Sequence, residues 1–342
     1  KFDGEPVSLY EIEAMNAALA HRGPDDSGVF VDGNIGLGQS RLSVIDLSFK
    51  ARQPISGEDE KVTVVCNGEI YNFLDLKSVL LNKGHRFVSD GDSEILPHAY
   101  EEWGMEGMLQ RLKGMFAFAL WDQNLGHLYL ARDRLGVKPL NYVVTPEHIG
   151  FASEPHALWQ LHSDRFEPNK EAINDYLSLG YTHLRSSFLN DIRKVAPASF
   201  IKIEKGNLKE VSYWSLPTTG HQANDRPLMD YLRDIDKLLY KAVERRMVSD
   251  VPLGVFLSSG IDSGLITAYA SKAFNRPIKT FTVDFSDVND ENFYKESLIA
   301  KQVADRYETD HNVLSVGADS IGHLPELIHH ASEPFADPSL LP

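Results

Sequence analysis

The chain has 342 residues, of which 42% are hydrophobic and 24% charged, as is typical of a globular protein with room for two or three domains. Its formal net charge of −15 argues against a nucleic-acid-binding protein, because such proteins carry basic surfaces. The single cysteine excludes a disulfide framework, and the sequence lacks an apolar run as long as a membrane-spanning helix. We therefore expect a cytoplasmic protein without a membrane partner.

Residues 1–205 have the pattern of a domain rich in antiparallel strands. Three segments have the apolar spacing of helices, namely 9–19, 73–82 and 94–103. Predicted strands lie at 27–31, 35–39 and 62–66, and two hairpins are expected, 114–121 with 127–131 and 140–144 with 149–153. Consecutive antiparallel strands with separate helices indicate an α+β layered domain.

The pattern changes after residue 205. Residues 206–228 are predicted to be a linker, beginning at a turn formed by Lys205, Gly206 and Asn207. Helices predicted at 229–247, 265–274 and 292–307 then alternate with strands predicted at 251–257, 279–285 and 311–316. This alternation predicts an α/β domain over 229–342 with a doubly wound parallel sheet, whose ligands bind at the carboxyl ends of the strands.

A loop of small residues, 258–263, joins one of these strands to the next helix. Backbone N–H groups and the positive end of a helix dipole favour an anion at such a point, and phosphate is the usual occupant. The loop lacks the lysine of a Walker A motif, but Asp262 suits a Mg²⁺ ion that bridges phosphates. A plain strand–turn–helix without a ligand is the alternative.

Five further motifs lie in the first 140 residues, at 21–28, 41–46, 67–72, 91–94 and 131–139. Together with the loop 258–263, which is similar to the S-G-G-x-D-S loop of ATP pyrophosphatases, they resemble the glutamine-dependent asparagine synthetase family. The resemblance covers essentially the whole chain. It implies a four-layer αββα Ntn-type amidotransferase domain, followed by an ATP-pyrophosphatase domain that is incomplete at its C-terminus.

The resemblance also implies a reaction. Glutamine is hydrolysed through a thioester, and the ammonia passes to an acyl-adenylate made from ATP, with Mg²⁺, and a carboxylate acceptor. Aspartate is the expected acceptor, giving asparagine, AMP and pyrophosphate, and a homodimer is possible because relatives often form one. The alternatives are another carboxylate acceptor, a plain or phosphoribosyl-type glutamine amidotransferase, and an inactive homologue that binds ATP and glutamine.

Residues for a glutamine site can be named. Arg41 can pair with the α-carboxylate through two N–H groups, and Glu69 and Asp92 can bind the α-ammonium group. By resemblance, the side chain of Asn67 and the backbone N–H of Gly68 form an oxyanion hole. Each has a simpler alternative: Arg41 as a surface charge, Asn67 and Gly68 as a turn, and residues 90–94 as a loose Ca²⁺ loop.

Residues for a nucleotide site follow from the resemblance as well. The phosphates are expected on Ser258, Ser259, Gly260, Asp262 and Ser263, and the adenosine near Leu257 and Val283. Ser259 stands where the family usually has glycine, and its side chain strains the loop only if the backbone is left-handed. Asp262 and Asp337 are the expected metal ligands and Glu333 a catalytic residue, although solvated acids at a helix end are an equal alternative.

The nucleophile of the family is a cysteine at the mature amino terminus, whose α-amine serves as the base. This chain starts at Lys1, so we expect the protein to begin with that cysteine ahead of Lys1; a truncated protein that uses only ammonia is the alternative. Cys66 is expected to be a buried core residue. A further group either joins the domains or carries surface charge: Arg132, Asp133, Arg134 and Lys138.

Overall fold

The computed structural model describes residues 1–161, 166–183, 185–217, 226–274, 276–285, 291–331, 333–335 and 337. The chain divides into two compact units, Lys1–Pro217 and Thr218–Pro342. Within the described ranges, no helix is both long and apolar enough to cross a membrane.

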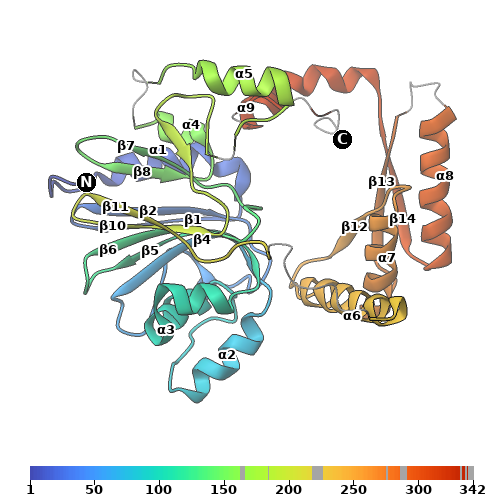
Figure 1. Ribbon diagram of the computed structural model, residues 1–342, viewed down its shortest axis with the longest axis horizontal. Helices are drawn as coiled ribbons and strands as arrows, with labels where there is room; N and C mark the ends of the chain where they lie inside the picture. Colours follow the sequence, from blue (N-terminus) through green and yellow to red (C-terminus); the bar gives the residue numbers. More distant parts are fainter. Residues whose placement is uncertain are drawn as a thin grey trace. The chain divides into compact units, whose positions relative to one another are not determined.

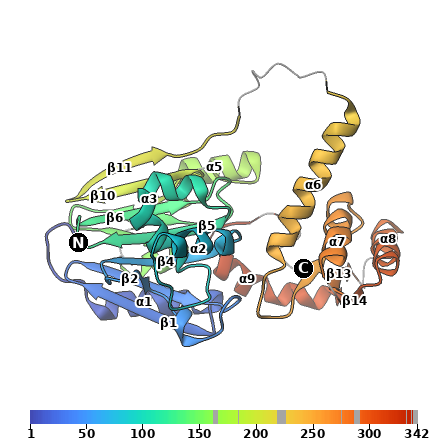
Figure 2. The ribbon, with the colours of Figure 1, turned by 90° about the horizontal axis from the view of Figure 1, so that it is seen from below.

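Three antiparallel sheets make up the first unit. The smallest is the hairpin of β1 (Asp26–Asp32) and β2 (Ile35–Arg41). The largest has the order β11-β10-β6-β5-β4-β3, part of which can be followed in Figure 2, and its strands are β3 (Ile55–Ser56), β4 (Val62–Ile70), β5 (Gly114–Asp122), β6 (His127–Arg132), β10 (Ser199–Glu204) and β11 (Asn207–Ser212). The third has the order β8-β7-β9, with β7 (Asn141–Val144), β8 (Ile149–Ala152) and β9 (Ile192–Lys194).

Helices lie on both outer sides of these sheets (Figure 1). α2 (Phe73–Asn82) and α3 (Ile95–Arg111) cover the large sheet, whereas α1 (Leu9–Ala18) and α4 (Pro155–Trp159) lie on the opposite side. A further helix, α5 (Lys170–Leu179), begins at Asn169, whose side chain accepts hydrogen bonds from two N–H groups of the first turn.

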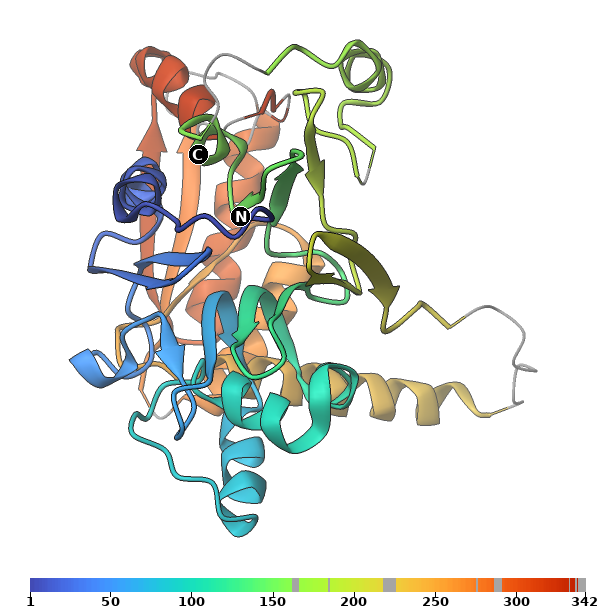
Figure 3. The ribbon, with the colours of Figure 1, turned by 90° about the vertical axis from the view of Figure 1, so that its left-hand side faces the viewer.

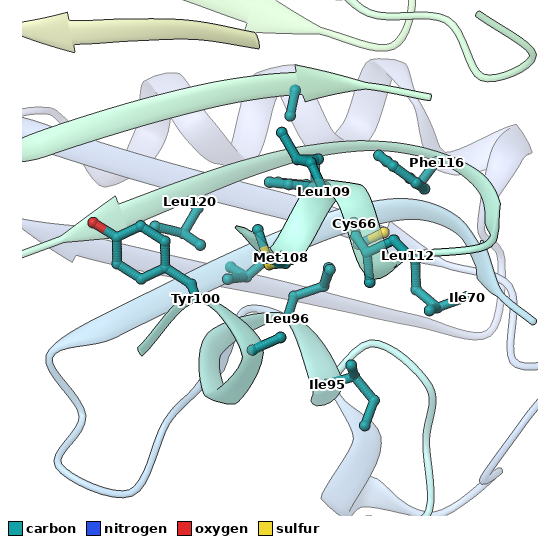
Figure 4. Close-up of a cluster of buried hydrophobic side chains, with 14 of the residues drawn as sticks. Cys66, Ile70, Ile95, Leu96, Tyr100, Met108, Leu109, Leu112, Phe116 and Leu120 are labelled. Atoms are coloured by element: carbon teal, nitrogen blue, oxygen red, sulfur yellow. The ribbon is translucent and has the colours of Figure 1, made fainter. Parts of the chain in front are cut away.

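Three hydrophobic cores separate the layers of the first unit. Side chains alternate along each strand, so that on β4 Val64 joins the core beneath α2 and α3, while Val65 joins the core on the other face of the sheet. Figure 4 shows the first of these cores, with Cys66 among its members. A third core packs Met15 of α1 and Leu158 of α4 against the β8-β7-β9 sheet. Three cores between four layers confirm the predicted αββα arrangement.

The structure corrects the predicted start of the linker. Residues 207–212, which were expected to be linker, form β11 and pair with β10 across a turn in which Lys205 and Gly206 have φ of 48° and 80°. β11 is an edge strand whose side chains are almost all exposed, so it lacks the alternation of apolar and polar residues that marks a half-buried strand.

The second unit contains a parallel sheet with the order β12-β13-β14, which confirms the parallel α/β arrangement. Its elements are α6 (Leu228–Arg246), β12 (Gly254–Phe256), α7 (Ile261–Ala273), β13 (Lys279–Phe285), α8 (Glu291–Arg306), β14 (Asp310–Val316) and α9 (Leu324–Ala331). α7 begins four residues before the predicted helix, so Asp262 and Ser263 lie in its first turn rather than in a loop.

Candidate active site

Two acidic side chains meet in the first unit. Glu69 lies on β4, and Asp92 lies just before α3, where its Oδ2 accepts the N–H of Ile70 at 2.7 Å. Asp92 is buried, and among the described residues Glu69 Oε2 is buried without a hydrogen-bond partner. Burial and the neighbouring charge of Asp92 raise the pKa of Glu69 to about 8, and burial raises the pKa of Asp92 as well. A bound cation would stabilise the ionised forms of these two carboxyls.

Arg41, at the end of β2, is also buried. Its Nη2 donates to the carbonyls of Ile45 at 3.0 Å and Asp46 at 2.7 Å, and its Nη1 approaches the carbonyl of Ser48 at 3.5 Å. The positive charge of Arg41 is close enough to oppose part of the rise in the pKa of Glu69. Because it is buried, the alternative of a surface charge is wrong. These bonds use three of the five guanidinium N–H groups, so two donors can still meet a carboxylate.

Asp46 connects the segment held by Arg41 to the segment that carries Asp92. Its Oδ2 accepts the N–H of Asp90 at 2.8 Å and its Oδ1 the N–H of Ser48 at 3.0 Å. Asp46 itself has a φ of 53°, the left-handed conformation that aspartate tolerates better than most residues. The structure therefore brings together Arg41, Glu69 and Asp92, which are far apart in the sequence.

Asn67 and Gly68 lie on β4 rather than in a turn, so the alternative of a simple Asn-Gly turn is wrong. The Asn67 side chain donates to Ser153 Oγ at 3.3 Å. Gly68 has a φ of 147°, and a Cβ there would overlap the carbonyl of Met115 on the neighbouring strand. Glycine is therefore required by the close approach of two strands. The oxyanion role of both residues stays a prediction.

Cys66 is a core residue, as predicted. It is 2% exposed, its N–H donates to Gln53 Oε1 at 2.6 Å, and its carbonyl accepts from Gln53 Nε2 at 3.2 Å. Burial and the nearby acids raise the pKa of its thiol well above the ordinary value. A buried thiol that resists ionisation is a poor nucleophile.

The sequence reasoning missed the role of residues 132–138. Asp133 is 2% exposed and accepts the N–H groups of Leu135, Val137 and Lys138 at 3.0–3.1 Å. Arg132 bonds carbonyls of the same unit, those of Gly136, Lys138 and Val195, all at 2.8 Å. For these two residues the surface-charge alternative is wrong, because their charges shape the loop. The loop positions Lys138, whose charge partly opposes the rise in the pKa of Glu69.

In the second unit, the residues 258–263 form a compact network of hydroxyl groups. Ser258 Oγ and Ser263 Oγ lie 2.9 Å apart, the N–H of Ser258 donates to Ser263 Oγ at 3.1 Å, and the N–H of Gly260 donates to Ser258 Oγ at 3.2 Å. Gly260 is the N-cap of α7. Ser259 is not among the described residues with positive φ, so its side chain adds no strain to the loop.

The other predicted nucleotide contacts differ in exposure. Leu257 is buried against Ala300 and Ala304 of α8, its carbonyl accepts from Thr282 Oγ1 at 2.6 Å, and its N–H donates to the carbonyl of Phe281 at 2.8 Å. Val283 lies on β13 next to Thr282. Asp262 is exposed on the first turn of α7, and Glu333 and Asp337 follow α9. The roles of these last three residues stay predictions.

Two known families match the chain, one over each of its two units. The family described as "Glutamine amidotransferase domain" matches residues 3–214, and "Asparagine synthase" matches residues 234–342. The chain belongs to the glutamine amidotransferase family. It carries this domain ahead of an asparagine synthase domain, which confirms the resemblance drawn from the motifs.

Two curated relatives carry the name asparagine synthetase. "Asparagine synthetase [glutamine-hydrolyzing] 1" of Bacillus subtilis is 36% identical over 97% of this chain and 51% of its own length. A putative asparagine synthetase of Methanocaldococcus jannaschii is 33% identical over 90% of this chain and 62% of its own length. The chain thus spans about half to three fifths of these curated relatives. A solved glutamine phosphoribosylpyrophosphate amidotransferase of B. subtilis has a TM-score of 0.47 at 17% identity, covering 92% of this chain and 80% of that one.

Proposed function

We propose that this chain belongs to an enzyme that hydrolyses glutamine and uses ATP to amidate a carboxylate, with aspartate as the acceptor and asparagine, AMP and pyrophosphate as products. The observation that carries the proposal is the buried pair of Glu69 and Asp92 beside Arg41. The names of the relatives supply the reaction class.

The first unit fits an α-amino acid. The α-ammonium group of glutamine would bring a positive charge to Glu69 and Asp92, whose raised pKa values reflect buried negative charge without a full counter-charge. The two remaining N–H groups of Arg41 would bind the α-carboxylate. Asn67 and Gly68 would then donate to the oxyanion that develops on the side-chain amide.

The second unit fits a nucleotide with its metal. The hydroxyl groups of Ser258 and Ser263 and the N-terminus of α7 suit phosphate oxygens. Mg²⁺ is commonly held by one or two carboxylates together with phosphates, and Asp262 offers such a carboxylate on the exposed first turn. When bound, the metal would neutralise charge on the pyrophosphate that leaves.

The test is pyrophosphate release by the full-length protein with ATP, Mg²⁺ and ammonium chloride, measured with and without aspartate. We expect release that depends on aspartate. Release with another carboxylate but not with aspartate would refute the acceptor, and the absence of release with every acceptor would refute the adenylation step.

Glutamine binding has a separate readout. Because the pKa of Glu69 is raised to about 8 and the carboxyl should ionise next to an ammonium group, binding near pH 7 should release protons. Calorimetry in two buffers of different ionisation enthalpy would measure them. A binding enthalpy that is equal in both buffers would contradict this arrangement.

A further inference from the structure

A second group of charged and imidazole side chains lies in the layer of α2 and α3 of the first unit, the cyan and teal helices of Figure 3. It consists of Glu58 in the turn between β3 and β4, His85 just after α2, and His98 and Glu101 on α3. Each residue offers one nitrogen or oxygen atom, and the four atoms all lie within 4.8 Å of one another. None of these residues has a part in the proposed reaction.

His98 is the most informative member of the group. It is 1% exposed, and among the described residues neither of its ring nitrogens has a hydrogen-bond partner. Its Nδ1 faces Glu58 Oε2 at 3.4 Å and Glu101 Oε2 at 3.9 Å. The ring thus faces carboxylates without a well-formed hydrogen bond to any of them, and a buried imidazole in that state calls for an explanation.

The shorter distances within the group are close to those between the ligand atoms of a tetrahedral metal site. Zn²⁺ binds histidine nitrogen and carboxylate oxygen at about 2.0–2.2 Å, which places neighbouring ligand atoms about 3.3–3.6 Å apart. His85 Nδ1 lies 3.6 Å from Glu58 Oε1 and 3.9 Å from Glu101 Oε2. These separations are long for hydrogen bonds, whereas a shift of a few tenths of an ångström would close them around an ion.

The outer nitrogens of both histidines also face carboxylates. His98 Nε2 lies 3.6 Å from Glu94 Oε1, and His85 Nε2 lies 3.6 Å from Glu102 Oε2. Metal-binding histidines commonly direct their second nitrogen to a carboxylate, which fixes the tautomer and the ring orientation. Glu58 is held as well, because its Oε1 accepts the N–H of Arg86 at 2.6 Å.

We propose that Glu58, His85, His98 and Glu101 bind one Zn²⁺ ion that has a structural role. Two imidazoles and two carboxylates are a donor set that suits zinc, whereas Mg²⁺ and Ca²⁺ prefer oxygen ligands alone. Four protein ligands leave no open position, which is typical of a structural site. The ion ties the β3–β4 turn to the end of α2 and to α3, and it closes the segment 85–98 that carries Asp92.

The test is zinc binding to the full chain after dialysis against a chelator, measured by competition with a chromogenic zinc indicator and by the visible spectrum of the cobalt-substituted protein. We expect one equivalent of Zn²⁺, a four-coordinate cobalt spectrum, a melting temperature raised by about 5 °C at 100-fold excess over Kd, and no competition from Mg²⁺. H85Q and H98Q should weaken zinc binding by about 100-fold or more, and E102Q by about 10-fold.

H21Q is the matched control, because His21 belongs to another group of possible ligands, with Glu154 and His156. It should leave the affinity of the main site unchanged. H85Q keeps the test decisive if H98Q fails to fold, since His85 is closer to the surface. The absence of zinc binding, equal binding by wild type and H85Q, or a loss in H21Q alone would overturn the proposal.

Discussion

The two candidate sites hold their ligand-facing groups in different ways. In the first unit, Arg41 and Asp92 are buried, and the charges of both act on Glu69. In the second unit, Ser258 and Asp262 are exposed, and backbone N–H groups and hydroxyls hold the loop. Burial holds the side chains of the first site in place but raises the pKa of its acids. The exposed start of a helix, in contrast, binds an anion mainly through its backbone N–H groups. Changes in the first site should therefore alter stability as well as activity, and changes in the second mainly activity.

Two glycines give the largest expected difference. Gly68→Ala would force a Cβ against the carbonyl of Met115 at a φ of 147°, so we expect a loss of about 3 kcal/mol or more in unfolding free energy. Gly264→Ala has open space around its Cβ within α7 and should stabilise that helix by about 0.5–1 kcal/mol. Chemical denaturation measures the change in unfolding free energy for each substitution. Equal changes for the two would contradict the prediction.

Asp262→Asn should act on catalysis alone. Loss of the carboxylate should reduce aspartate-dependent pyrophosphate release by about 100-fold or more, because the metal would be held less well at the phosphates. The melting temperature should change little, since an exposed acid at a helix start contributes about 0.3–1 kcal/mol. Glutamine hydrolysis by the same variant serves as the control, and a parallel loss of that activity would show that the two units are not separable in this way.

The pH dependence of stability distinguishes the buried site. The pKa of Glu69 is raised from 4.5 to about 8 in the folded chain, so the folded state binds more protons than the unfolded state between these values. The stability of the first unit should therefore fall as the pH rises from about 4.5 to about 8. Glu69→Gln should reduce this fall, leaving the part that comes from Asp92, whose pKa burial also raises. The measurement is the melting temperature of both proteins at several pH values. The same dependence of melting temperature on pH in the variant as in the wild type would contradict the prediction.

The smallest effect is expected at Ser259. Because its backbone is not left-handed, Ser259→Gly relieves no strain and should change kcat/KM for ATP by less than about 2-fold. A large gain in activity on this substitution would show that the serine side chain obstructs the phosphates.

The sequence predicts the helices and strands whose own apolar spacing and end signals are clear. The predicted ranges 73–82 and 279–285 match α2 and β13 residue for residue, because each has a clear apolar pattern and a clear end. β11 was missed because an exposed edge strand owes its structure to the neighbouring β10. α5 was missed although Ile173, Tyr176 and Leu177 have helical apolar spacing and Asn169 caps the first turn.

The sites show the same limit. The motifs around Arg41, Glu69 and Asp92 named residues that the fold brings together, but their spacing in sequence says nothing of the distance between them in space. The group around His98 was missed for that reason, since its members come from three separate segments and only His98 and Glu101 are close in sequence. The pKa of Glu69 also depends on burial, which the fold alone determines.

The central claim is that one protein joins glutamine hydrolysis to ATP-dependent amidation. The most direct test incubates the full-length enzyme with ATP, Mg²⁺, aspartate and glutamine labelled with ¹⁵N in its amide, and follows the label by mass spectrometry. The account predicts asparagine that carries ¹⁵N in its amide, formed in equal amounts with AMP and pyrophosphate. Labelled ammonia without labelled asparagine, under conditions in which glutamine is consumed, would contradict it.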